Sequence, residues 1–251
     1  MHQLDERWEL ARGGASPSDG QIYDHLLTAI VEHDVTPGTK LPEDTLAETF
    51  GVSRTRIRKV LHQLGHEGVV QLERHRGASV ARPSVKEARD VFDVRRILEA
   101  GMMRLLAGSG LGAREIARLR REVAEERDAY GRHDRRRAIA LSGKFHLELA
   151  RLTGNAALHG IMRELVSRTS LIIAVYAPAR GPICLCDEHE ALIGAIRRGD
   201  VEEAARVMDH HLEHIAATLA LAADDAAAAI DLKAVLAGVA RRRRSTEPEP
   251  E

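Results

Sequence analysis

Aromatic residues and cysteine are scarce in this chain of 251 residues. Aromatic side chains make up 3% of the sequence, which argues against binding of single-stranded nucleic acid by stacking of bases on rings. The two cysteines, Cys184 and Cys186, cannot build a disulfide framework. No apolar run approaches the roughly 20 residues that a membrane span needs, and the amino-terminal segment carries acidic groups in place of an apolar signal sequence. We therefore expect a cytoplasmic protein with no membrane partner.

An excess of charge of one sign is also absent. The formal net charge is −1, which excludes a protein that binds nucleic acid through its overall positive charge. The charges are unevenly distributed, however. Residues 1–50 hold three Lys/Arg against ten Asp/Glu, whereas residues 51–82 hold seven Lys/Arg against two Asp/Glu. A local basic cluster in a neutral chain is a candidate surface for binding a polyanion.

The basic cluster falls in a segment with the layout of a winged helix-turn-helix domain. Hydrophobic periodicity predicts helices over residues 22–31, 43–50 and about 54–65, followed by strand-like pieces at 69–72 and 78–81. Gly51 provides a turn before the third helix, Ser53 can cap that helix, and Gly77 lies in the turn of the hairpin. Two helices, a turn, a third helix and a hairpin form the order of a winged helix-turn-helix.

The third predicted helix has one apolar and one basic face. Its apolar residues recur from Ile57 at i, i+3, i+4 and i+7, so they form a buried face. A helix fits the major groove of DNA, where arginine and lysine reach guanine edges or phosphates. The alternative is an ordinary solvated basic face, but the preceding turn, the cap and a basic wing favour DNA binding. The candidate DNA-binding residues are Arg54, Thr55, Arg56, Arg58, Lys59, Arg76 and Gly77.

The rest of the chain predicts a second, all-α domain. Ser84 and Glu87 match a capping box, and the sequence beyond them is helical apart from breaks near residues 108–112, 131–134, 154–155, 178–182 and 199–200. A last helix is expected over Ala222–Ala240. The predicted organisation is a flexible tail (1–19), a winged helix-turn-helix domain (20–82), a helical bundle (84–240) and a disordered tail (241–251). The predicted fold class is therefore mainly α.

Three histidines lie on the apolar stripes of separate predicted helices. His146, His189 and His211 each align with apolar neighbours at helical spacing, such as Leu149 for the first and Met208 for the last. A single buried histidine is usually a core residue with its hydrogen bonds satisfied. Three inward-facing histidines can instead converge in a bundle core to bind a metal, and neutral imidazoles suit zinc, copper, iron or nickel. Both interpretations stay open at this point.

Arg95 shares an apolar stripe with Val91 and Met102, and a buried guanidinium needs an anionic partner. One candidate partner is Glu99, four residues further along the same helix. The other is a carboxylate ligand held by the two-pronged guanidinium. The residues by themselves favour neither. Two i, i+4 histidine pairs, His62/His66 and His210/His214, are expected on polar faces rather than in metal sites.

Residues 22–82 resemble the winged-helix domain of GntR-type bacterial transcription regulators. The matching segments are 37–43, 46–48, 51–55, 57–58, 61–64, 67–68 and 76–80. The sequence departs from the family pattern at Arg56, where most members carry proline, and at Asp44, where many carry an arginine that touches DNA. The resemblance therefore implies operator binding with a sequence preference different from the commonest operators.

The remainder is similar to the all-helical effector domain of the FadR subfamily, on segments 93–99, 145–146, 154–155, 188–189 and 211–212. This resemblance implies a homodimer that binds a palindromic operator in double-stranded DNA and responds to a small carboxylate-type effector. Arg95 matches a position that often faces the effector. In many members three histidines and an aspartate hold a divalent metal. Carried over, these histidines are His146, His189 and His211, and the resemblance implies zinc or nickel.

Ser142 stands where the family aspartate lies, four residues before the first histidine. A hydroxyl is a far weaker ligand for a divalent cation than a carboxylate. Three arrangements therefore stay open: a three-histidine site completed by water or effector, a weaker site, and a pocket without metal. Arg95 and Ser142 are the candidate effector-binding residues.

We predict a ligand-responsive transcription regulator, acting as a repressor, and not an enzyme. The helix from Arg54 would enter the major groove, and the wing at Arg76 and Gly77 would approach the minor groove or backbone. One alternative is a metal-dependent enzyme that uses the three histidines, although Glu188 and Glu190 fall off the inward stripe and leave no evident general base. Another is a constitutive DNA-binding protein without effector.

Overall fold

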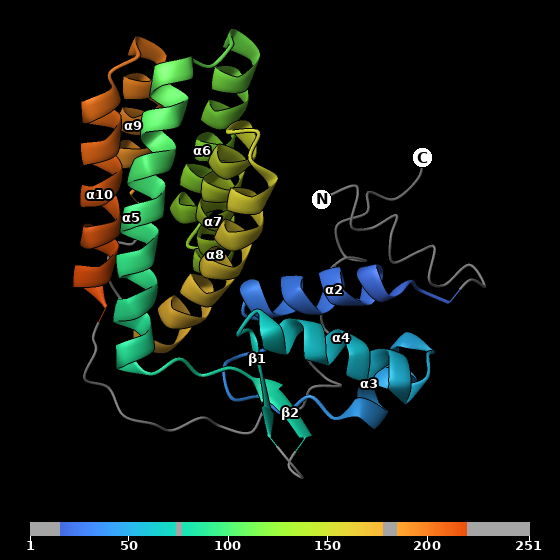
Figure 1. Ribbon diagram of the computed structural model, residues 1–251. Helices are drawn as coiled ribbons and strands as arrows, with labels where there is room; N and C mark the ends of the chain where they lie inside the picture. Colours follow the sequence, from blue (N-terminus) through green and yellow to red (C-terminus); the bar gives the residue numbers. More distant parts are fainter. Residues whose placement is uncertain (1–15, 74–76, 178–184, 220–251) are drawn as a thin grey trace, which may run out of the picture. The chain divides into compact units, whose positions relative to one another are not determined.

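The computed structural model describes residues 16–73, 77–177 and 185–219, and the chain divides into two compact units (Figure 1). Of the described residues, those up to Arg82 belong to the first unit and those from Pro83 onward to the second. The described part of the first unit holds three helices and a small sheet, and the described part of the second contains helices and the turns between them. The predicted fold class, mainly α with a winged helix-turn-helix before a helical bundle, is confirmed.

The first unit contains helices α2 (Asp19–Val31), α3 (Glu43–Phe50) and α4 (Arg54–His66), in the predicted order. A capping box starts α2, because the hydroxyl of Ser18 accepts from the backbone N–H of Gln21 at 3.2 Å and the Gln21 side chain accepts from the backbone N–H of Ser18 at 2.8 Å. α3 ends at Gly51, whose φ of 65° is the left-handed conformation that glycine adopts most readily. The turn between α3 and α4 therefore follows from the sequence.

The wing is an antiparallel hairpin of β1 (Val70–Glu73) and β2 (Gly77–Val80). Each strand lies one residue away from its predicted position. A third extended segment, which the sequence analysis did not predict, joins the sheet where Lys40 bridges to Ser79. The backbone N–H of Leu41 donates to the carbonyl of Ala78 at 2.8 Å. A bridge of so few residues leaves no alternation of polar and apolar side chains by which to recognise it.

The second unit contains α5 (Val85–Ser109), α6 (Ala113–Gly131), α7 (Arg135–Leu152), α8 (Ala156–Tyr176), α9 (Cys186–Arg198) and α10 (Val201–Thr218). The helices end close to the predicted breaks. The predicted capping box of α5 is present: Ser84 Oγ accepts from the backbone N–H of Glu87 at 3.2 Å, and Glu87 Oε2 accepts from the backbone N–H of Ser84 at 2.7 Å. Side chains of Asp134, Asn155 and Asp200 cap α7, α8 and α10.

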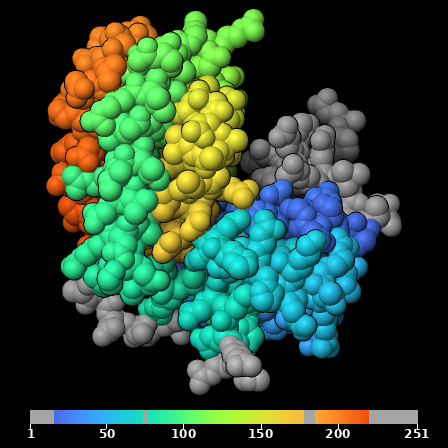
Figure 2. Space-filling model, viewed as in Figure 1, coloured from blue at the N-terminus to red at the C-terminus, as the bar shows by residue number. Residues whose placement is uncertain are grey.

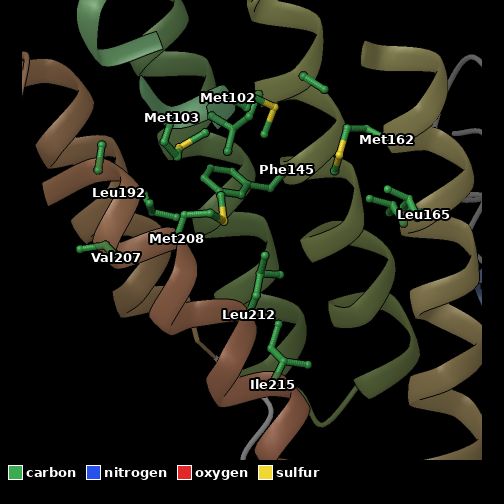
Figure 3. Close-up of a cluster of buried hydrophobic side chains, with 14 of the residues drawn as sticks. Met102, Met103, Phe145, Met162, Leu165, Leu192, Val207, Met208, Leu212 and Ile215 are labelled. Atoms are coloured by element: carbon green, nitrogen blue, oxygen red, sulfur yellow. The ribbon is translucent and has the colours of Figure 1, made fainter. Parts of the chain in front are cut away.

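The core of the helical unit forms where its six described helices turn their apolar faces inward. Figure 3 shows Phe145 of α7 at the centre of this cluster, with Met102 and Met103 of α5 and Met208 of α10 around it. α5 packs along α10, and α6 packs against α7 and α9. Phe145 is fully buried, and its ring lies 4.3 Å from the ring of His189 between centroids. The core therefore reaches directly to the predicted metal-ligating histidines.

Several expectations concern residues outside the described part of the chain. They are residues 1–15 of the amino-terminal tail, the carboxy-terminal tail, the helix over Ala222–Ala240, the wing residue Arg76, and Cys184. The tail was predicted to reach residue 19, which is wrong, because the capping box of Ser18 starts α2 at Asp19. Among the described helices, none is long and apolar enough to cross a membrane.

Candidate DNA-binding surface and three-histidine site

α4 presents a basic face because its apolar face is buried. Ile57, Val60, Leu61 and Leu64 are buried as predicted, and α4 packs against α2. Arg54, Thr55, Arg58 and Lys59 are exposed on the rest of the helix. Ser53 occupies the N-cap position, but its side chain makes no capping hydrogen bond.

Each exposed basic residue of α4 already has a carboxylate beside it. Arg58 donates from Nε and Nη2 to the two oxygens of Glu43, at 2.9 and 2.7 Å. Lys59 pairs with Asp19 at 3.0 Å, and Arg54 pairs with Asp44. Exposed ion pairs of this kind contribute only about 0–1 kcal/mol. The pairs therefore hold the basic side chains in position without preventing an exchange of carboxylate for phosphate.

Arg56 differs from the other basic residues of α4, because it is half-buried and turned toward the start of α2. Its Nε donates to Asp19 at 2.8 Å, its Nη1 to the hydroxyl of Ser16 at 3.0 Å, and its Nη2 to the carbonyl of Pro17. The structure thus gives Arg56 a place inside the unit, where it links α4 to the segment before α2. Gly77 is exposed at the start of β2, with a φ of 83°.

The second unit brings together the three histidines that periodicity selected. His146 comes from α7, His189 from α9 and His211 from α10, and all three are buried. Nε2 of His211 lies 3.3 Å from Nε2 of His146 and 3.2 Å from Nε2 of His189. Three helices that are separate in the sequence therefore point one ring nitrogen each at a common centre.

A carboxylate lies behind each of these rings. Nδ1 of His146 is 2.5 Å from Glu99, Nδ1 of His189 is 2.9 Å from Glu126, and Nδ1 of His211 is 2.7 Å from Glu188. A carboxylate, when ionised, only accepts hydrogen bonds, so a neutral ring that faces one holds its proton on Nδ1 and leaves the lone pair of Nε2 free. This is the arrangement by which histidine ligands of metals are oriented in proteins.

The sequence analysis missed two of these carboxylates. Glu126 was findable, because it continues the buried stripe of Ile116, Leu119 and Val123 on α6, where an unpaired charge is costly. Glu188 lies off the inward stripe of α9, as predicted, but the stripe did not reveal that it contacts His211 of the neighbouring helix α10.

The charges of the site follow from burial and from these contacts. Burial favours a raised pKa for Glu99, but the Arg95 guanidinium and the His146 ring outweigh it and lower that pKa to about 2. Burial lowers the pKa of His146. Burial, together with the nearby His189, lowers the pKa of His211 to about 3. His146 and His211 are therefore neutral imidazoles, and the carboxylate of Glu99 beside His146 is ionised.

Arg95 forms the ion pair with Glu99 that the sequence offered as one of two possibilities. Its Nε donates to Glu99 Oε1 at 2.6 Å, and both side chains are buried. This pair does not provide partners for all the hydrogen-bond donors of the Arg95 guanidinium, however. Nη2 of Arg95 is buried and has no hydrogen-bond partner among the described residues. A buried donor without a partner is costly, so the second possibility, an anionic ligand, stays open beside the ion pair with Glu99.

The donor set fits a four-coordinate metal ion. Zinc binds histidine nitrogen at about 2.0–2.1 Å, which places neighbouring ligands of a tetrahedral site about 3.3 Å apart. The two measured separations between Nε2 atoms, 3.3 and 3.2 Å, match this value. Two lone pairs at that distance repel each other unless a cation or a proton lies between them. Ser142, half-buried one turn before His146 on α7, offers a hydroxyl at the position of the family aspartate.

Comparison with known proteins identifies the family. Residues 19–80 match the family described as bacterial regulatory proteins, gntR family, and residues 90–214 match the FCD domain. The chain belongs to the GntR family and carries an FCD domain as its helical unit. It is a DNA-binding transcriptional regulator with an FCD effector domain. The resemblance seen in the sequence is thereby confirmed.

Individual relatives agree with this assignment. The chain is 24% identical over 200 residues to the HTH-type transcriptional repressor RspR of Escherichia coli (strain K12), covering 79% of this chain and 87% of the relative. A GntR transcriptional regulator from Rhodococcus sp. RHA1 has a TM-score of 0.73 at 21% identity, covering 82% of this chain and 99% of that one. E. coli McbR/YncC has a TM-score of 0.69 at 20% identity, covering 78% and 93%. At these identities the solved structures show the fold alone.

The family and these relatives are transcriptional regulators and not enzymes. The prediction that the chain is not an enzyme is therefore confirmed, and the alternative of a metal-dependent enzyme is set aside.

Proposed function

We propose that the protein is a homodimeric, effector-responsive repressor whose helical unit binds a small carboxylate through a divalent metal ion and Arg95. The observation that carries the effector half is the convergence of three Nε2 atoms, each oriented by a carboxylate, beside a buried guanidinium donor without a partner. A core built for packing alone gains nothing from lone pairs that face one another.

DNA binding is assigned to the exposed face of α4. Arg54, Arg58 and Lys59 would contact bases or phosphates of the major groove, and Thr55 would supply a shorter polar contact. The carboxylates beside the basic residues are exchanged for phosphates on binding. Arg56 reaches DNA only after leaving its contacts with the start of α2. The wing residues Arg76 and Gly77 are proposed to approach the minor groove or the adjacent backbone.

Dimerisation is assigned to the outward face of α5. Val94, Ile97 and Leu105 are 42%, 73% and 57% exposed, although all are large and apolar. They lie at i, i+3 and i+11, with Gly101 at i+7, so they share one side of the helix. Figure 2 shows α5 as blue-green spheres with one side facing the viewer. A two-fold axis would pair the stripe with its own copy, as in the commonest symmetric dimers.

The metal is assigned to His146, His189 and His211, with zinc or nickel as the ion. When bound, the cation would supply a positive centre able to ligate an effector carboxylate. Because Ser142 is a poor ligand, a coordination position is left for water or for that carboxylate. Arg95 would donate its remaining Nη2 to the same ligand, and the hydroxyl of Ser142 would hydrogen-bond it. An effector changes operator affinity only by binding the two states of the dimer unequally.

The test is the metal content per protomer of untagged protein purified without chelator. We expect about one firmly bound equivalent in the wild type and almost none in His146→Ala. His159→Ala, on α8 and outside the cluster, is the matched control and should keep the metal. Equal metal in wild type and His146→Ala would remove the metal from the proposal, and operator affinity indifferent to every carboxylate tested would leave a constitutive DNA-binding protein.

A further inference from the structure

A second group of metal-binding side chains lies on the surface of the helical unit. Glu188 of α9 and His210 and His214 of α10 each offer a ligand atom, and these atoms all lie within 4.8 Å of one another. We propose that these three residues form a second, solvent-facing site for a divalent d-block cation such as Zn²⁺, Cu²⁺ or Ni²⁺. This outer site is separate from the buried site of His146, His189 and His211.

The backbone already places the two outer histidines on one face. His210 and His214 are one helical turn apart, and their ring centroids are 6.0 Å apart. Helical zinc motifs present a pair of histidine ligands at this same i, i+4 spacing. Both side chains are exposed, so they can turn at low cost to shorten separations of up to 4.8 Å to the roughly 3.3 Å of a zinc site.

The carboxylate of Glu188 completes the outer group. Its Oε1 accepts from Nδ1 of His214 at 2.8 Å, so the acid and one histidine are already in contact across two helices. The His210 ring makes no hydrogen bond within the described ranges and is available as a ligand. Two imidazoles with one carboxylate favour zinc, copper or nickel over magnesium or calcium, and water would complete the coordination. A histidine protonated before binding releases that proton to solvent.

Glu188 also connects the outer site to the buried one. Its Oε2 accepts from Nδ1 of His211, and its Oε1 accepts from His214. A cation bound at the outer site would withdraw electron density from Glu188, the carboxylate that orients His211. The inference that the two sites influence each other rests on the proposed buried metal, whereas the existence of the outer site does not.

The experiment is equilibrium dialysis of the full-length protein against Zn²⁺, with metal counted per protomer. We expect two equivalents in the wild type and one in His146→Ala, which keeps only the outer site. The double variant His210→Ala/His214→Ala should also bind one equivalent, and the triple variant almost none. The control is His62→Ala/His66→Ala, an exposed pair with the same spacing on α4, which should bind as the wild type does.

The outcomes separate the two sites. If the double variant binds as many equivalents as the wild type with the same affinity, the outer site is refuted, whatever happens at His146. If the double variant loses an equivalent and His146→Ala does not, the outer site stands and the buried metal fails. Because His210 and His214 are exposed, their replacement should leave the melting temperature unchanged, which checks that a lost equivalent reflects lost ligands. Glu188→Gln should lose the outer equivalent as well.

Discussion

Replacing Glu126 by glutamine tests whether the carboxylates orient the buried histidines for a metal. Glu99 also pairs with Arg95 and Glu188 also contacts His214, so Glu126, whose partner in the site is His189, gives the most direct test. Glutamine keeps the volume and one acceptor oxygen, but it removes the negative charge and can present its NH₂ group to Nδ1. In that second orientation Nδ1 becomes the acceptor, Nε2 carries the proton, and the ligand is lost.

The expected loss follows from the replacement of groups that hydrogen-bond a metal-binding histidine, which costs about 10- to 100-fold in metal affinity. At about 1.36 kcal/mol per tenfold change, this corresponds to about 1.4–2.7 kcal/mol. The buried contact of 2.9 Å between Glu126 and His189 places the variant within this range, because solvent cannot replace the lost charge.

The assay is competition for Zn²⁺ between the protein and a chromophoric chelator. Glu125→Gln, an exposed neighbour on α6, is the control and should keep wild-type affinity. Operator binding without effector should be unchanged in both variants, which shows that the first unit is intact. An affinity of Glu126→Gln within twofold of the wild type would refute the claim that a carboxylate fixes the tautomer of His189.

Other predictions concern DNA binding, assembly, the coordination shell and stability. Arg58→Ala should weaken operator binding by roughly 1–3 kcal/mol if it reads a base; unchanged fluorescence anisotropy would contradict its place in the groove. Ile97→Asp should yield monomers in sedimentation analysis, whereas Ile161→Asp on α8 should not, although Ile161 is also 48% exposed. Ser142→Asp should raise Zn²⁺ affinity at least about tenfold, since a carboxylate replaces a hydroxyl as the fourth ligand; equal affinity would show that residue 142 does not reach the ion. The backbone N–H and the hydroxyl of Ser84, at the N-cap of α5, lower the pKa of Glu87. The ionised Glu87 carboxylate therefore stabilises the folded protein above the usual glutamate pKa of 4.5, and this stabilisation is lost as the pH falls below that value. Glu87→Gln should therefore reduce the difference in melting temperature between pH 7 and pH 3.

The basic face of α4 illustrates what periodicity can and cannot reveal. The spacing of its apolar residues correctly separated the buried side from the exposed one. It could not show that Arg56 turns toward Asp19 and Ser16, because those partners lie about 40 positions away in the sequence, at separations of 37 and 40 residues. Which flank of a helix meets a neighbour depends on how the helices pack.

The carboxylates of the histidine site also show that sequence periodicity does not reveal which residues meet across helices. Glu126 lies on an apolar stripe and was recognisable as a buried charge in need of a partner. Glu188 lies beside His189 in the sequence but contacts His211 and His214 on the next helix. Adjacency along the chain says nothing about this contact.

The sequence by itself determined the order of the described elements, their ends to within about three residues, the buried faces and the family, because these follow from local periodicity, capping and turn residues. It also selected His146, His189 and His211, since a polar residue on an apolar stripe is visible at a period of 3.6. Only the tertiary structure decided that the three Nε2 atoms meet, that a carboxylate lies behind each ring, and that Glu188 joins a buried cluster to an exposed one. Those contacts are set by the rotation and spacing of packed helices, and these depend on every side chain in the core at once.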